Sequence, residues 1–297
     1  MVNKGDYLSF TTNTWTAEHS TQSFMGLTCH WWTNSFVCHS VVLHCAAFNE
    51  HHTAKNLLTV FELMLQKWNI VIRDNAFNIV KCFRDGNYAS VGCFAHTLQL
   101  CVRDGLLNQK CATDITGAVR QLVGHFRHSS SAIARLHELQ KELGLPQHQL
   151  IQNVATRWNS TFYMLRRILE QRRSVSLYCA EVESVSALTA QQWTITENAV
   201  ALLQPYEEVT HEVSSAQASI SVVIPMLKLL AAVFQKDAGA DGVKSMNVGL
   251  LEAVDSRFAD VEENSLYSCA TLLDPHFKQR FLSESGHSAA RAHLLLA

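Results

Sequence analysis

Proline and glycine are scarce in this 297-residue chain, which contains 4 and 12 of them. This scarcity excludes collagen-like and low-complexity proteins. Neither sign of charge dominates, because 24 Lys and Arg residues stand against 26 Asp and Glu residues. The chain as a whole is therefore not drawn to nucleic acid or to a membrane surface. Any contact with DNA must come from a local basic patch.

Long apolar runs are also missing, since no stretch approaches the roughly 20 residues that span a bilayer. The start from Met1 to Asp6 is polar, unlike a secretory signal. The nine cysteines form no Cys-x-x-Cys pair. We therefore expect a reduced, intracellular protein with no membrane partner and with mostly buried cysteines. What the chain does have is 47% hydrophobic residues, enough to build a globular core.

The first hundred residues alternate between strand and helix patterns. Strands are predicted at residues 7–12, 23–32, 36–44, 70–72 and 91–93. Helices are predicted at residues 53–68, 76–83 and 94–104, the first of them with Thr53 as its N-cap. The first three strands are joined by short turns, which predicts an antiparallel meander. The full order, β-β-β-α-β-α-β, matches a ribonuclease-H-like core in outline.

Beyond Gly105 the pattern becomes helical. Helices are predicted at residues 114–126, 131–143, 160–179, 191–213, 221–236 and 246–261. We therefore expect an α/β plus all-α protein with a ribonuclease-H-like core at residues 1–105. A helical domain at residues 106–282 and a tail at residues 283–297 complete it.

Asp74 follows the short apolar run at residues 70–72. An acid at the end of a buried strand is where α/β folds place functional groups. Asp74 also precedes a predicted helix, where an acid caps the first turn. Both interpretations of Asp74 remain open.

Five short segments occur in order along the chain: 11–16 (TTNTWT), 74–80 (DNAFNIV), 93–100 (CFAHTLQL), 156–160 (TRWNS) and 270–278 (ATLLDPHFK). Together they resemble the hAT transposase superfamily, and within it the zinc finger BED domain-containing proteins that derive from such transposases. The resemblance extends over residues 7–282. It implies a ribonuclease-H-like core interrupted by a large helical insertion, a nuclear location, and DNA as a partner.

The resemblance also assigns residues. The family's first catalytic acid falls on Asn13 and its second on Asp74. Its Cys-x-x-His pair falls on Cys93 and His96, where it orders the core. The structural alternative is a buried cysteine beside a hydrogen-bonded histidine. A zinc site would need two more ligands.

The departures from the family pattern concern catalysis. Asn13 is a neutral amide, whereas Mg²⁺, the cofactor of active relatives, prefers anionic oxygen ligands. We also expect the third acid and the BED finger to be absent. The dimerisation region, through which relatives form homo-oligomers, is expected to be absent too. The core is then C-terminally truncated. The sequence thus predicts a catalytically inactive protein without a metal or cofactor. Its role would be DNA association, protein interaction or transcription regulation. The alternatives are an active Mg²⁺-dependent transposase or nuclease, and an interaction scaffold without affinity for DNA.

In the family, an Arg-Trp pair lies near the transposon end, and this pair falls on Arg157 and Trp158. A basic patch accompanies it. Residues 157–173 contain five arginines and one glutamate. Arg166 and Arg173 are seven residues apart, so a single helix would place both on one face to contact phosphates, while Trp158 stacks on an unpaired base. The alternative is a solvated helix face with Trp158 in the core.

Overall fold

A computed structural model describes the protein at residues 8–16, 22–32, 37–48, 51–65, 70–73, 77–87, 89–107, 109–154, 157–215, 218–236 and 244–296. The chain divides into two compact units, which we call the α/β unit (Met1–Thr97) and the helical unit (Leu98–Ala297). Sequence analysis places this boundary at residue 105. Each unit is described by itself.

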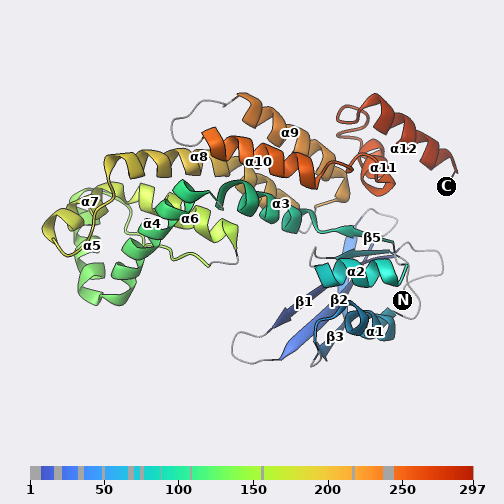
Figure 1. Cartoon of the computed structure of the whole chain (residues 1–297), viewed down its shortest axis with the longest axis horizontal. Coiled ribbons are helices and arrows are strands. Elements are labelled where there is room, and N and C mark those ends of the chain that lie inside the picture. Colours follow the sequence, from blue (N-terminus) through green and yellow to red (C-terminus); the bar gives the residue numbers. More distant parts are fainter. Residues whose placement is uncertain are drawn as a thin grey trace. The chain divides into compact units, whose positions relative to one another are not determined.

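The α/β unit contains a five-stranded sheet in the order β3-β2-β1-β4-β5 (Figure 1). Its strands are β1 (Leu8–Thr16), β2 (Ser23–Trp32), β3 (Cys38–Phe48), β4 (Ile70–Arg73) and β5 (Ala89–Gly92). The first three strands form the expected antiparallel meander, and β4 pairs in parallel with β1 and β5. Helix α1 (Ala54–Leu65) precedes β4 and α2 (Phe77–Asp85) follows it, so the observed order of elements is the expected one.

One face of the sheet packs against α1 and α2. Side chains alternate along a strand, so every second residue of β1 and β2 points to this face. The face includes Phe10, Met25 and Leu27, all fully buried. Phe61 of α1 meets Phe83 of α2 edge-on, with ring centroids 4.5 Å apart. Thr53 caps α1 as predicted, since its hydroxyl accepts from the Asn56 N–H at 3.3 Å.

The helical unit begins within α3 (Phe94–Val102), which continues as a π-helical turn at Arg103–Leu107. The larger helices that follow are α4 (Lys110–His128), α5 (Ser130–Glu142), α6 (Trp158–Glu170), α7 (Arg172–Glu181), α8 (Ala190–Val213), α9 (Val223–Lys236), α10 (Lys244–Arg257), α11 (Ser265–Leu273) and α12 (Glu284–Leu296). Gly105 and Gly249 let the π-helical turn approach α10, because a Cβ on either glycine would come within 2.7 Å of the other segment's backbone. Among the described residues, no helix combines the length and apolar character that crossing a membrane requires.

Two sequence predictions about the helical unit are wrong. The helix expected over 160–179 is two helices, because the chain breaks at Gln171, whose buried side chain bonds to the Pro146 carbonyl and to Gln140. The expected tail at residues 283–297 contains α12, which packs on α11 through the buried Ala290. Both errors have one origin: tertiary contacts, which local patterns do not report, decide these segments.

Candidate functional site

Asn13, on which the resemblance places the family's first acid, lies on β1, next to β4. The parallel pairing places Phe10 beside Val71 and Thr12 beside Arg73. Asn13 directly follows Thr12, at the end of this paired segment. Asp74, the expected second acid, lies outside the described residues. Its pairing with Asn13 therefore stays a prediction.

Asn13 lies on the face of the sheet opposite to the core. Phe10 and Thr12 point into the core, so the alternation turns Asn13 outward, and its side chain is exposed. Asn13 pairs with Gly26 of β2, and its Oδ1 would lie 2.9 Å from a Cβ placed on that glycine. Gly26 therefore leaves the room that the amide occupies.

The described side chains that β1 and β2 turn to this face are neutral. Thr11 Oγ1 and His30 Nε2 are 3.0 Å apart and share a hydrogen bond. Burial lowers the pKa of His30, so its imidazole is neutral at pH 7. Trp15 stacks on Phe24 with ring centroids 5.6 Å apart and stays 41% exposed. The face thus offers an amide, a hydroxyl, an imidazole and aromatic surface.

The described donors on this face do not fit the magnesium ions that the resemblance implies for active relatives. Two-metal catalysis requires carboxylates that bind both ions and compensate their charge. Asn13 can supply a neutral oxygen but no charge, and His30 is a nitrogen ligand that Mg²⁺ does not favour. In the part of the chain that the structure describes, no group of three or more His, Cys, Asp or Glu side chains could hold a metal ion.

Cys93 and His96 flank the start of α3 and are both half-buried. The Cys93 carbonyl accepts from the Thr97 N–H at 3.0 Å and from the Thr97 hydroxyl at 3.1 Å. These bonds hold the first turn of the helix. The ordering role that the resemblance gives to Cys93 and His96 stays a prediction.

Trp158 belongs to the core of the helical unit. Its side chain is 3% exposed, and its ring lies 6.5 Å from the rings of Phe162 and Tyr206. The expectation that Trp158 stacks on a base does not fit this placement, because neither ring face is accessible. Arg157 precedes it as the exposed N-cap residue of α6.

The predicted arginine stripe is divided between two helices. Arg166 lies on α6 above the rings of Phe162 and Tyr163, with its guanidinium carbon 5.2 and 5.3 Å from their centroids. Arg173 is exposed on α7, beyond the break at Gln171. The expectation that Arg166 and Arg173 share one helix face is therefore wrong.

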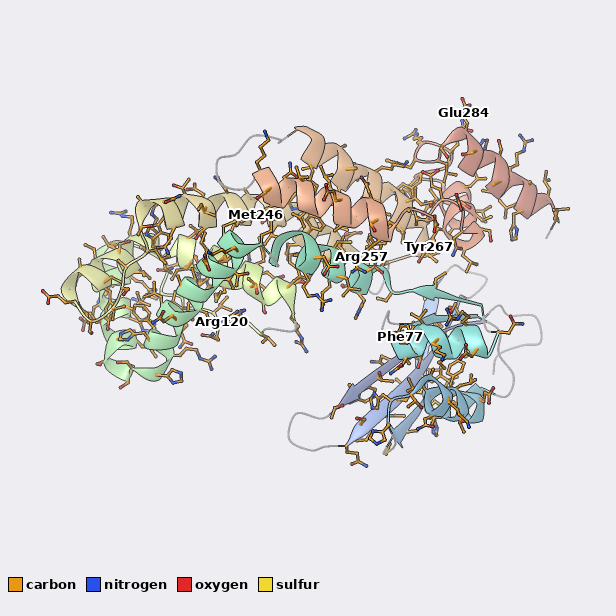
Figure 2. All side chains as sticks on the ribbon, in the orientation of Figure 1. Phe77, Arg120, Met246, Arg257, Tyr267 and Glu284 are labelled. Atoms are coloured by element: carbon orange, nitrogen blue, oxygen red, sulfur yellow. The ribbon has the colours of Figure 1, made fainter. Side chains whose placement is uncertain are left out.

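Helix α4 carries two exposed arginines, Arg120 and Arg127, that were not among the residues predicted to bind DNA. Arg120, labelled in Figure 2, donates from Nε to Asn153 Oδ1 at 2.9 Å. Asn153 belongs to the segment 145–154, which leads to Arg157. The available signal was spacing, because Arg120 and Arg127 are two helical turns apart. The density of arginines along the sequence is instead highest at residues 157–173 and favours that segment.

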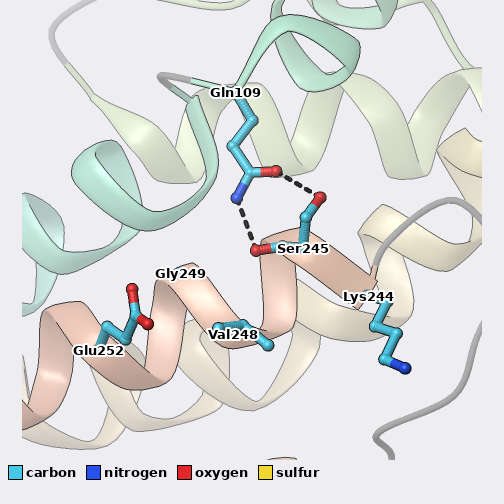
Figure 3. A pocket seen from close by; sticks show the side chains of 6 residues that line it. All are labelled: Gln109, Lys244, Ser245, Val248, Gly249 and Glu252. Atoms are coloured by element: carbon cyan, nitrogen blue, oxygen red, sulfur yellow. Dashed lines mark hydrogen bonds between the residues drawn. The ribbon is translucent and has the colours of Figure 1, made fainter.

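An open hollow of about 640 Å³ lies between the start of α4 and α10 (Figure 3). Gln109 crosses it: its Nε2 donates to the Ser245 carbonyl at 2.8 Å, and its Oε1 accepts from the Ser245 hydroxyl at 2.8 Å. Lys244 and Glu252 line the hollow along α10. Since both Nε2 and Oε1 of Gln109 already form hydrogen bonds, we interpret this hollow as part of the packing contact between α4 and α10.

Comparisons with known proteins agree with this architecture. Residues 11–99 match the family model described as the ZBED1 RNase-like domain, and residues 91–202 match the ZBED1 RNase-like helical domain. Zinc finger BED domain-containing protein 4 of Homo sapiens is 28% identical over 93% of this chain and 25% of its own length. Zinc finger BED domain-containing protein 6 of Homo sapiens is 30% identical over 91% of this chain and 30% of its own length.

A plant protein joins these relatives. A protein of Zea mays whose name describes it as an AC transposase is 25% identical over 71% of this chain and 29% of its own length. The fold and the relatives define a transposase-derived protein. More narrowly, the chain belongs to the hAT-derived family that includes the zinc finger BED domain-containing proteins. It spans between a quarter and a third of the length of these relatives.

Proposed function

We propose that this chain is a catalytically inactive, transposase-derived protein that associates with DNA in the nucleus. In this account the α/β unit is a ribonuclease-H-like core and the helical unit is its insertion. The residue that supports the loss of catalysis is Asn13, because the chain has a neutral amide where the resemblance places the first acid, and the described side chains of β1 and β2 on this face are neutral. Metal-dependent strand cleavage there would lack one of the charges that bind the ions.

Support for DNA as the partner comes from exposed arginines in the helical unit. Arg157 and Arg173 are exposed, as are Arg120 and Arg127 of α4. Because the net charge of the chain is −2, attraction to DNA must come from such a local concentration. The buried Trp158 gives the Arg-Trp segment a structural role beside this electrostatic one, since its ring anchors the first turn of α6, directly after Arg157.

The net charge also supports a second candidate function, an interaction scaffold without affinity for DNA. The two functions predict different responses to salt. A protein that contacts phosphates releases counterions when it binds, so its affinity falls steeply as salt rises. A scaffold shows no such dependence.

The test is fluorescence anisotropy with a labelled DNA duplex between 50 and 200 mM salt. We expect binding that weakens with salt, with Arg157→Glu weaker than the wild type. Arg291→Glu is the matched control, because Arg291 is exposed on α12 and the change in charge is the same. Absence of binding at 50 mM salt would contradict the proposal and favour the scaffold.

A further inference from the structure

Helix α4 presents a line of residues to solvent on the side away from its core. Its members recur every three or four positions, which places them on one side of a helix. They are Lys110, Thr113, Gly117, Arg120, Gly124 and Arg127. The opposite side, with the buried Val119, Leu122 and Phe126, packs into the core of the helical unit. We call this line the basic face.

The two glycines of the basic face are not required by the helical unit itself. A Cβ placed on Gly117 or Gly124 would meet nothing within 4 Å in the described structure. Glycine in a helix interior lowers helix stability relative to alanine. At Gly105 and Gly249 the missing Cβ permits a close helix contact. At Gly117 and Gly124 the room that glycine leaves lies open to a partner from outside.

Cations lie beside this open room. Arg120 sits between the two glycines, and Arg127 follows one turn after Gly124. Their spacing of seven residues corresponds to about 10 Å along the helix, roughly the axial rise of three nucleotides of one DNA strand. Asp114 is an exposed acid at the far end of the same helix. The arrangement therefore concentrates positive charge in the C-terminal half of α4.

The segment 145–154 adds polar groups next to these arginines. Asn153 holds Arg120, and the Gln149 carbonyl accepts from Arg167 Nη1 at 2.8 Å. Arg167 also pairs with Glu170 at 2.7 Å, so that acid is already compensated. Amide side chains beside arginines are common at surfaces that contact phosphate and sugar.

A hollow of about 40 Å³ lies at the Arg127 end of the basic face, lined also by His137, Gln149 and Leu150. His137 Nε2 is buried there and has no hydrogen-bond partner within the described part of the chain. A buried nitrogen without a partner is costly, and it is ordinarily paired with water or a ligand.

We propose that the basic face binds the sugar-phosphate backbone of DNA, which passes over Gly117 and Gly124 while Arg120 and Arg127 pair with its phosphates. This inference rests on the proposed function and deepens it, because it assigns DNA contact to α4 rather than to the stripe predicted on residues 157–173. Glycine permits the close approach, and the arginines supply the attraction.

The experiment measures the salt dependence of DNA binding by anisotropy in the full chain. We expect the double variant Arg120→Glu/Arg127→Glu to bind at least tenfold more weakly at 100 mM salt. We expect the slope of log K against log salt to become shallower by about 2, since each phosphate contact contributes about 0.9. Arg291→Glu serves as the matched charge control.

A second variant separates loss of binding from loss of fold. Gly117→Leu/Gly124→Leu fills the open room with side chains that favour helix, so its melting temperature should equal or exceed that of the wild type. Its affinity for DNA should nevertheless fall several-fold. Ala201→Leu, at an exposed position of α8, is the control for added bulk.

The outcomes distinguish this inference from the proposed function. If the wild type binds DNA and both α4 variants bind equally well, the inference is wrong and the proposed function stands through other residues. That result would fit α4 as a docking site for a protein. If the wild type fails to bind at 50 mM salt, the inference and the proposed function both fail.

Discussion

Trp158 shows how a residue of a family motif can act through the fold. Trp158 is the first residue of α6 and directly follows the exposed Arg157. Its side chain is 3% exposed and packs on Phe162 and Tyr206. The ring anchors the start of α6, which directly follows Arg157. If Arg157 contacts DNA, as we propose, a change at Trp158 would alter that contact indirectly.

We predict that Trp158→Ala lowers the free energy of unfolding by about 3–5 kcal/mol, because it removes a large buried ring and leaves a cavity. Urea denaturation followed by circular dichroism measures this loss. Trp15→Ala is the control, since Trp15 is 41% exposed and should cost much less. An effect of equal size at both positions would contradict the buried placement of Trp158.

Cys82 supplies a prediction about pH. Burial raises the pKa of its thiol from 9.0 to about 12. The folded state thus holds this proton more tightly than the unfolded chain does. The stabilisation is complete below pH 9 and falls as the pH rises towards 12. We expect the free energy of unfolding to decrease between pH 8 and pH 10, and Cys82→Ala to weaken this dependence.

Thiol labelling provides the companion measurement. Cys45 is exposed on β3, whereas Cys82 is fully buried. At pH 8 an alkylating reagent should modify Cys45 in the folded protein and reach Cys82 after unfolding. Equal labelling rates for the two thiols under native conditions would refute the buried position of Cys82.

At the scale of elements, the break between α6 and α7 depends on buried amides. Gln140 Nε2 donates to Gln171 Oε1 at 3.0 Å and to the His148 carbonyl at 2.9 Å, and Gln171 Nε2 donates to the Pro146 carbonyl at 3.1 Å. Both glutamines are fully buried. These bonds hold the segment 145–154 against the helices, beside the basic face.

We predict that Gln140→Ala lowers the free energy of unfolding by about 1–3 kcal/mol, because it leaves the buried Gln171 amide and the His148 carbonyl with fewer partners. Chemical denaturation of the variant measures the change. Gln191→Ala, at an exposed position of α8, should remain within about 0.5 kcal/mol of the wild type. A negligible effect at Gln140 would exclude the amide network as a stabilising feature.

The elements differ in how far their sequence predicts them. α1 and α4 carry regular apolar stripes, so local periodicity found both. The break at Gln171 escaped detection, because its cause is a pair of amides from segments about thirty residues apart. The same limit applied to Arg166 and Arg173. Their expected position on one face depended on a single continuous helix. The meander of β1 to β3 was predictable from turns and alternation, which are local signals.

At the scale of the whole molecule, each unit has a core of its own. Phe10, Leu57 and Phe61 belong to the core of the α/β unit, whereas Val119 and Leu136 belong to that of the helical unit. The sequence pattern changes near Gly105, whereas the two units meet at Thr97. The pattern does not mark Thr97, because α3 continues across this boundary as a regular helix.

Separate cores predict separate responses to mutation. Phe61→Ala should lower the stability of the α/β unit by about 3–5 kcal/mol, and Leu136→Ala that of the helical unit by about 2–5 kcal/mol. Hydrogen exchange followed by mass spectrometry assigns the loss of protection to each unit. If either variant exposed both units equally, the two cores would unfold as one.

The candidate site was predictable in part. The motif order pointed to Asn13 and to Arg157, and both are exposed in the structure. The neutral character of the described face around Asn13 depends on the pairing of β1 with β2, which brings Gly26 beside Asn13 and His30 beside Thr11. The basic face of α4 depends on which side of that helix is buried. Neither fact is contained in a local motif.

The central claim is that this protein holds DNA and does not cut it. The most direct measurement incubates the wild type with a labelled, hairpin-ended DNA at 50 mM salt, with and without Mg²⁺, and follows anisotropy and strand scission in the same samples. The account predicts bound DNA that stays intact whether or not Mg²⁺ is present, because Asn13 supplies no charge for the metal. Mg²⁺-dependent cleavage of the bound strand would contradict it.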